Sequence, residues 1–299
     1  MIKKTIFAYM RSVCFFASYF TGNKLPYYIT VYLKELKAHF SEVVLITSGG
    51  KLSAESENYI TSQNIQHLSL ENNGFDFGLW YQAFQRFDVL SYDKIALVND
   101  SCILFKSLDD LMHWSVNNKA DLQGITFSES IATHIQSYFL ILNKNAIALT
   151  KDYFIMHGVL KDITEVIKVY EIGLSTYLQE KGLKLSAYID NNGYKGEFSP
   201  YYYCLSYHLN KGIPVIKKKI LFSSYRKDEL FTLARMDFNI DPDHYIAQIE
   251  KGSTNSLIDF HKLRSDIPVK FGILSKLKYN LTRLFIKVFR PAYKQIKGA

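Results

Sequence analysis

The first half of the chain alternates short apolar runs with longer amphipathic stretches. The apolar runs are typical of buried strands and predict strands over 5–9, 43–46, 65–70, 94–98 and 122–127. Between them, apolar residues recur at helical spacing and predict helices over 26–40, 53–63, 77–87 and 108–116. Such alternation indicates βαβ units. We therefore expect an α/β fold with a mostly parallel sheet that helices cover on both faces.

The pattern changes in the second half. A strand is predicted over 138–142, an amphipathic helix over 163–180 and a further strand over 184–189, followed by a loop rich in Asn, Gly and Tyr over 191–203. Residues 223–268 favour helices only in parts, and no stretch rich in Pro, Gly and Ser marks a linker. We expect one main domain over 1–222 and a C-terminal helical region over 223–299.

Charge is concentrated at the C-terminal end. The 299 residues carry a net charge of +8, and residues 270–299 contain basic but no acidic side chains. Over 273–296, apolar residues at helical spacing are interleaved with lysine and arginine, which predicts a basic amphipathic helix on an anionic membrane surface. A helix packed on the domain is the alternative. A nucleic-acid partner is not expected, because no recognised nucleic-acid module is present.

The cysteines and the apolar segments indicate in which cellular compartment the protein is found. The three cysteines are widely spaced and odd in number, which argues against a disulfide framework. The basic and apolar N-terminal segment resembles a signal peptide. However, Arg11 interrupts its apolar stretch, and no small-residue cleavage site follows. No run reaches the roughly 18 apolar residues of a membrane span. We expect a cytoplasmic protein, peripheral at the inner face of the membrane.

The first candidate for chemistry joins a strand to a helix. It contains Asn72, Asn73, Gly74, Asp76 and Gly78. Glycines permit close backbone approach, and free amides at a helix N-terminus are suited to a diphosphate. The alternative is local: Asp76 caps the helix and the glycines make the turn.

The second candidate follows the buried strand over 94–98. Asn99, Asp100 and Ser101 stand at its carboxyl end, where α/β proteins bind ligands. Asp100 could hold a divalent cation on a diphosphate or contact a sugar hydroxyl. A capping role in the next turn is the alternative.

The third and fourth candidates lie further along the chain. Glu171, on the helix over 163–180, could act as a general base, or be an ordinary solvated charge. Strand alternation places His134, Gln136 and Tyr138 on one face, a polar row that suits a sugar, and Ser137 belongs to the same segment. A structural role for the histidine is the alternative.

These segments, in this order, resemble the rhamnan synthesis protein F family over about residues 4–222. The matching segments read N-N-G-F-D-F-G, V-N-D-S, H-I-Q-S-Y-F, Y-E-I-G-L-S-T-Y-L and I-P-V-I-K-K-K-I-L. The family consists of bacterial glycosyltransferases of cell-surface polysaccharide assembly. A wider resemblance to family 2 glycosyltransferases implies a GT-A-like fold. It also implies donor contacts from the segments around Gly74 and Asp100, with Glu171 as the base. Tyr9 and Ser48, at the ends of the first two strands, would contact the nucleotide.

The resemblance implies transfer from a nucleotide-sugar, with dTDP-rhamnose favoured, to a saccharide or lipid-linked saccharide, and we expect inversion. One departure concerns the metal motif, which has a single acid, Asp100, where two are expected. A divalent cation, Mg or Mn, is therefore in doubt. Lys217, Lys218 and Lys219 could neutralise the diphosphate instead, although a solvated charge run is the favoured interpretation. Alternatives are a non-catalytic partner in a polysaccharide assembly complex, a sugar-phosphate transferase and a basic nucleic-acid-binding protein.

Overall fold

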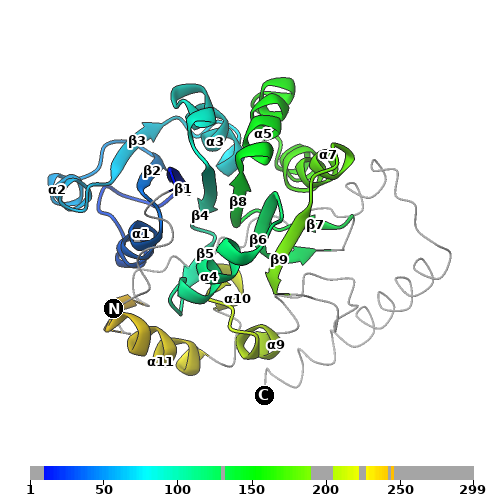
Figure 1. Cartoon of the computed structure of the whole chain (residues 1–299). Helices are drawn as coiled ribbons and strands as arrows, with labels where there is room; N and C mark the ends of the chain where they lie inside the picture. The colour runs from blue at the N-terminus through cyan, green and yellow to red at the C-terminus, as the bar shows by residue number, and fades with distance from the viewer. Residues whose placement is uncertain (1–9, 129–131, 190–204, 222–226, 242–243, 246–299) are drawn as a thin grey trace, which may run out of the picture. The chain divides into compact units, whose positions relative to one another are not determined.

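The fold was obtained as a computed structural model of the whole chain (Figure 1). The structure describes residues 10–128, 132–189, 205–221, 227–241 and 244–245. All of them fall within one compact unit, Met1–Asp259. The strand predicted over 5–9, with Tyr9, and the basic helix predicted over 273–296 lie outside the described residues. The domain boundary predicted at 222 stays a prediction.

A mixed sheet forms the centre of the described part of the chain. Its strands are β1 (Ser12–Ser18), β2 (Glu42–Ser48), β3 (Gln66–Leu70), β4 (Lys94–Asn99), β6 (Leu122–Ser128), β7 (His134–Ile135), β8 (Phe139–Asn143) and β9 (Leu185–Ile189). The order is β3-β2-β1-β4-β8-β6-β7, with β9 beside β6. Strands β3, β2, β1 and β4 are parallel, whereas β8 runs antiparallel to both β4 and β6. The predicted α/β fold class, with a mostly parallel sheet between helices, is confirmed.

Helices pack on both faces because side chains alternate along each strand. In β1, Cys14 and Phe16 belong to one core and Val13, Phe15 and Ala17 to the other. The first core includes residues of α1 (Tyr27–His39), α2 (Ala54–Ser62), α4 (Asp109–Asn117) and α11 (Lys227–Phe238). The second includes residues of α3 (Phe75–Arg86), α5 (Lys144–His157), α6 (Ile163–Val166) and α7 (Leu174–Glu180). Figure 1 shows this layering around the sheet.

Small elements complete the described part. The antiparallel pair β5 (Cys102–Leu104) and β10 (Val215–Lys217) carries the chain beyond residue 200 back to the end of β4. The short helices are η2 (Val89–Ser91), which precedes β4, α9 (Leu205–Asn210), which precedes β10, and α10 (Lys218–Leu221), which follows β10. None of the helices in the described ranges combines the length and apolar character that crossing a membrane requires.

Several described elements were not predicted, among them β1 and α5. The first described strand is β1, whose run S-V-C-F-F-A-S is buried throughout, as is the predicted strand β4. Helix α5 was not predicted, although Ala146, Ile147 and Phe154 are buried along it. The other helices and strands predicted over the described residues are found within a few residues of their expected bounds.

Candidate site at the carboxyl edge of the sheet

Parallel pairing brings separate segments of the chain to one edge of the sheet. In the register of β1 and β4, Ala17 pairs with Asn99, so Ser18 and Asp100 leave the two strands side by side. The backbone N–H of Asp100 donates to the Ala17 carbonyl over 3.2 Å. The Ser18 hydroxyl donates to Asp100 Oδ2 over 3.0 Å. Asp100 thus lies at the carboxyl edge of the sheet, as predicted, and its contact with a donor stays a prediction.

Asp100 is buried but well paired, with 7% of its surface exposed. Tyr28, in the first turn of α1, donates its hydroxyl to Oδ2 over 3.4 Å. Lys218 Nζ lies 3.2 Å from the same oxygen and 3.2 Å from the Tyr28 hydroxyl. Burial raises the pKa of Asp100, while the Lys218 ammonium and the Ser18 hydroxyl oppose that rise. The carboxylate therefore holds a lysine at the strand end.

Asp76 joins this cluster from the start of α3. Its Oδ2 accepts from Asn99 Nδ2 over 2.7 Å. The N-cap of α3 is Gly74, with no side-chain capping bond, so the alternative capping role of Asp76 is not what the structure shows. Burial, then the nearby charges of Asp100 and Glu171, raise the pKa of Asp76 to about 7, against the opposing charge of Lys218. Asp76 thus lies in the electrostatic field of both other acids.

The turn before α3 requires its glycines. Gly74 has φ +87°, and a Cβ there would lie 2.9 Å from the Leu160 carbonyl oxygen. A Cβ on Gly78 would lie 1.7 Å from the Asn73 carbonyl oxygen, which leaves no room for any other residue. Phe75 also adopts a left-handed conformation, with φ +57°, and is 41% exposed. Asn72 is exposed and Asn73 partly so. The backbone at the two glycines is therefore closely packed, whereas the side chains of Asn72 and Phe75 are exposed to solvent.

Glu171 lies on a π-helical segment, η3 (Ile167–Gly173), within the helix predicted over 163–180. Tyr170, beside it, stacks on Phe77 of α3 with ring centroids 5.1 Å apart. That contact brings Glu171 and Asp76, the neighbours of the two rings, into the same region. Such π-helical turns are frequent at functional sites. The Glu171 side chain is 21% exposed, so the alternative of a fully solvated helix charge does not describe it.

The predicted acceptor segment divides into two parts. His134 donates its Nδ1–H to the Ala132 carbonyl over 2.7 Å, which leaves Nε2 facing Glu171 Oε1 at 3.9 Å. Gln136 and Tyr138 are buried, and both bond the Thr126 hydroxyl over 2.8 Å. Ser137 is partly exposed. His134 therefore belongs with Glu171, whereas the groups of Gln136 and Tyr138 are engaged inside the fold.

Ser48 ends β2 at the same edge. It is buried, and its hydroxyl has no hydrogen-bond partner among the described residues. A buried hydroxyl without a partner is costly unless something else binds it. At the end of the neighbouring strand β1, the corresponding residue is Ser18.

Lys218 is the functional candidate whose environment the sequence did not reveal. The interpretation of Lys217 to Lys219 as a solvated charge run is wrong for Lys218, whose side chain is only 14% exposed and pairs with Asp100. The ammonium also lies 5.0 Å from the centroid of the Tyr28 ring. The apolar run just before Lys218 could have indicated a buried strand, and in the structure it forms β10, which pairs with β5.

The arrangement around Asp100 also tests the predicted metal. A divalent cation would require carboxylate oxygens that are free to bind it. Here Asp100 Oδ2 accepts from Ser18 and Tyr28 and pairs with Lys218, and Asp76 Oδ2 accepts from Asn99. These contacts engage one oxygen of each carboxylate, and the Lys218 ammonium supplies a positive charge beside Asp100. The predicted divalent cation at Asp100 stays a prediction.

Known proteins place this architecture in context. No curated protein matches the chain. Among solved structures, the glycosyltransferase GlyE of Streptococcus pneumoniae is 13% identical, with a TM-score of 0.41 over 83% of this chain and 66% of its own. A cytidylyltransferase from Leptospira borgpetersenii is 13% identical, with a TM-score of 0.37 over 74% and 96%.

A third similar structure is the mannosyltransferase PcManGT of Pyrobaculum calidifontis, solved with GDP-Man and Mn²⁺. It is 8% identical, with a TM-score of 0.39 over 60% of this chain and 54% of its own. Similarities of this size do not specify a substrate. A family model, in contrast, matches residues 43–259, which is most of the chain and contains Asp76, Asp100, Glu171 and Lys218. The chain belongs to the rhamnan synthesis protein F family.

Proposed function

We propose that the chain is a glycosyltransferase that moves a sugar from a nucleotide-sugar to a saccharide or lipid-linked saccharide acceptor in bacterial cell-surface polysaccharide synthesis. The observation that carries the proposal is the cluster at the carboxyl edge of the sheet. There, Asp76, Asp100 and Glu171 come from three separate segments, and the charges of Asp100 and Glu171 raise the pKa of Asp76. The ammonium of Lys218 pairs with Asp100 beside them. Membership of the family supports it. The favoured donor is dTDP-rhamnose.

The reaction we infer is a single inverting displacement. An acceptor hydroxyl oxygen attacks the anomeric carbon, the bond from that carbon to the diphosphate breaks, and the hydroxyl proton passes to the Glu171 carboxylate. The electron pair of the broken bond leaves with the nucleoside diphosphate. A positioned base typically contributes about a hundred- to ten-thousand-fold to the rate. His134 Nε2 lies 3.9 Å from Glu171 Oε1, which is beyond hydrogen-bond distance.

The remaining residues have assigned parts in this proposal. Lys218, held by Asp100, neutralises the leaving diphosphate, which charged donors stabilise most strongly in a partly desolvated site. The turn from Asn72 to Gly78 lies at the rim and contacts the donor, as do Asn99 and Ser101. The buried hydroxyl of Ser48 has no protein partner in the described residues and is assigned to the nucleoside.

Glu171→Gln tests the base. We expect kcat for transfer to fall by about a hundred-fold or more while donor binding is retained, because the amide keeps the shape but cannot take the proton. Glu165→Gln is the matched control, since Glu165 is exposed one helix segment earlier. Near-wild-type turnover of Glu171→Gln would exclude this residue as the base.

The donor is tested separately, by thermal shift with a panel of nucleotide-sugars, each with and without manganese. We expect one donor to be preferred by at least tenfold, which corresponds to about 1.4 kcal/mol, and manganese to add little. If no nucleotide-sugar binds, the chain is a non-catalytic member of its family and the proposal fails.

A further inference from the structure

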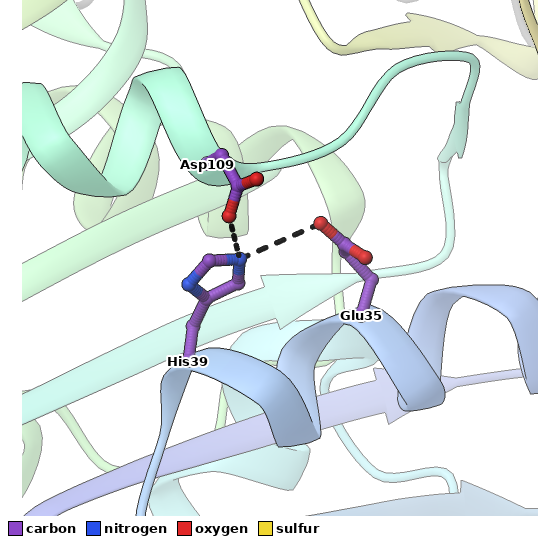
Figure 2. Close-up of side chains that lie close together, drawn as sticks. All are labelled: Glu35, His39 and Asp109. Carbon is purple, nitrogen blue, oxygen red and sulfur yellow. Dashed lines mark ion pairs between the residues drawn. The ribbon is translucent and has the colours of Figure 1, made fainter. Parts of the chain in front are cut away.

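Glu35, His39 and Asp109 form an ion-paired group that connects α1 to α4 (Figure 2). His39 Nε2 lies 3.4 Å from Glu35 Oε1 and 3.5 Å from Asp109 Oδ1. The same Glu35 oxygen accepts from the Ser107 hydroxyl and from the Leu108 backbone N–H, each over 2.7 Å. These contacts hold the group together from within, so it links two helices and indicates no ligand.

Phe75, the first residue of α3, is different, because it is a large apolar residue in an unfavourable backbone conformation. Its φ of +57° is left-handed, where the Cβ of an L-residue lies too close to the following carbonyl oxygen. Two other non-glycine residues in the described part of the chain have a positive φ, and both are asparagine, which tolerates this conformation. A glycine or an asparagine would therefore fit position 75 with less strain.

The turn itself fixes this conformation. A Cβ on Gly74 would collide with the Leu160 carbonyl oxygen, and a Cβ on Gly78 would collide with the Asn73 carbonyl oxygen. The Gly78 backbone N–H also donates to the Gly74 carbonyl over 2.8 Å. The backbone at position 75 therefore cannot relax unless the turn opens. Strain that the surroundings maintain in this way is often found where ligands bind.

The core of the fold does not account for the ring of Phe75. This residue is 41% exposed, whereas Phe77, two residues later, is 3% exposed and stacks on Tyr170. Burial explains a phenylalanine at position 77, but not at position 75. A single exposed apolar residue is ordinary by itself. One that also occupies a strained position indicates that its ring makes a contact outside the fold.

The neighbours of Phe75 place it at one end of the candidate site. Asp76, the next residue, accepts from Asn99 at the end of β4 over 2.7 Å. Ser48, which is assigned to the nucleoside, ends β2, and β1 lies between β2 and β4 in the sheet. Two strand spacings amount to about 10 Å. Position 75 therefore belongs to the sugar end of the site and not to its nucleoside end.

The proposed base lies beside the same turn. Phe77 and Tyr170 stack with their ring centroids 5.1 Å apart and their planes at 10°. Glu171 follows Tyr170 directly in the chain. An acceptor whose hydroxyl reaches Glu171 would therefore bring its sugar ring close to the turn that carries Phe75.

The exposure of the residues indicates which of the two sugars the ring contacts. The groups assigned to the nucleoside diphosphate are enclosed, since Ser48 is 3% exposed and the Lys218 side chain 14%. Phe75 lies at the surface. A saccharide acceptor continues into solvent beyond the hydroxyl that reacts, so it fits an exposed ring. A pyranose also presents C–H groups on its faces, which pack on the electron-rich face of an aromatic ring.

We propose that Phe75 is the residue on which the acceptor sugar stacks, and that its left-handed backbone holds the ring at the surface for this contact. The inference rests on the proposed glycosyl transfer, which assigns the asparagines and glycines of the turn to the donor and leaves this ring without a part. Stacking holds the acceptor beside Glu171 through its apolar face, while its hydroxyls stay free to react.

The test measures the binding of small glycosides to the full chain by saturation-transfer NMR. The probes are the methyl glycosides of rhamnose, glucose and galactose, each titrated separately. We expect the wild type to bind at least one of them, with the strongest transfer at the C–H protons of the sugar ring. Phe75→Gly should weaken that binding at least fivefold, whereas Phe75→Tyr, which keeps a ring, should bind as wild type. Leu90→Gly is the control and should also bind as wild type, since Leu90 is 45% exposed but lies in η2, before β4.

Stability separates a stacking residue from a structural one. Glycine adopts a φ of +57° without strain, so Phe75→Gly should have a Tm no more than about 2 °C below that of the wild type. A larger fall would mean that the ring supports the fold, and would overturn the proposal.

Three results of the binding measurements would also overturn it. They are equal glycoside binding by Phe75→Gly and wild type, no glycoside binding by the wild type, and a loss confined to dTDP-rhamnose, which would assign the ring to the donor. Failure of the proposed function is a separate result, in which the wild type binds no nucleotide-sugar in the thermal-shift panel.

Discussion

Asp76 is a carboxyl group whose charge depends on its neighbours. It is only partly exposed, it lies near two other acids, and its pKa of about 7 places its titration in the physiological range. In the unfolded chain the same group titrates near pH 4. Between those values the unfolded chain has lost the proton and the folded chain retains it. Ionisation of Asp76 therefore lowers stability as the pH rises through this window.

Asp76→Asn should remove that dependence. The difference in free energy of unfolding between Asp76→Asn and wild type should shift in favour of the variant by on the order of 1–2 kcal/mol from pH 4 to pH 8. Urea denaturation at the two pH values measures it, with exposed Asp152→Asn as the control. An equal difference at pH 4 and pH 8 would contradict the assigned pKa.

Lys218 supports a second prediction at this scale. Lys218→Met removes the charge assigned to the leaving diphosphate, and we expect kcat/KM for the donor to fall by about a hundred-fold. Lys211→Met, an exposed lysine seven residues earlier, is the control and should retain wild-type kinetics. If the two variants are equally active, Lys218 only pairs with Asp100.

The residues differ in how far the sequence could place them. Asp100 was predictable, because a carboxylate straight after a buried strand reaches the ligand-binding edge in any parallel sheet. The pairing of Lys218 with Asp100 was not, since it spans 118 residues and depends on β10 docking on β5. The buried contacts of Gln136 and Tyr138 with Thr126 could not be predicted either. Strand alternation predicts on which face of the sheet a side chain lies, but not which side chain it contacts.

At the scale of elements, buried strands and amphipathic helices carried clear signals and were found near their predicted bounds. Strand β1 and helix α5 were exceptions. The sequence favours the run over 5–9 as the first strand, although β1 is as continuously buried as the predicted strand β4. The π-helical turn around Glu171 had no signal in the apolar spacing, which fits an ordinary helix over the same residues. Within that turn, Tyr170 stacks on Phe77 of α3.

The start of α3 provides a prediction for an element. Gly78→Ala would place a Cβ 1.7 Å from the Asn73 carbonyl oxygen, so the turn must open. We expect a loss of about 2–3 kcal/mol or more of unfolding free energy, measured by chemical denaturation. Gly182→Ala is the control: it has φ +83° but open space around it, and should cost only about 1 kcal/mol. Equal losses would mean that backbone conformation alone explains the glycine.

For the whole molecule, the distribution of charge leads to a proposal about location. Lysine and arginine interleaved with apolar residues over 273–296 favour docking on an anionic membrane, with roughly 1 kcal/mol for each basic residue near the surface. Lipid-linked acceptors would be found there. We propose that this segment brings the enzyme to the cytoplasmic face of the membrane.

Removal of residues 273–299 should therefore release the protein from anionic vesicles, measured by co-sedimentation. Uncharged phosphatidylcholine vesicles serve as the control and should bind neither form. Retention of the shortened chain on anionic vesicles would show that the docking surface lies elsewhere.

The pairing of Asp100 with Lys218 also has a consequence for the order in which the protein is made. The ribosome synthesises β1 to β9 and the three acids of the cluster well before it reaches β10. The ammonium that balances those acids is therefore supplied last, by a segment that reaches the sheet through its pairing with β5. On the proposed mechanism, a chain that ends before β10 would lack the cation assigned to the leaving diphosphate.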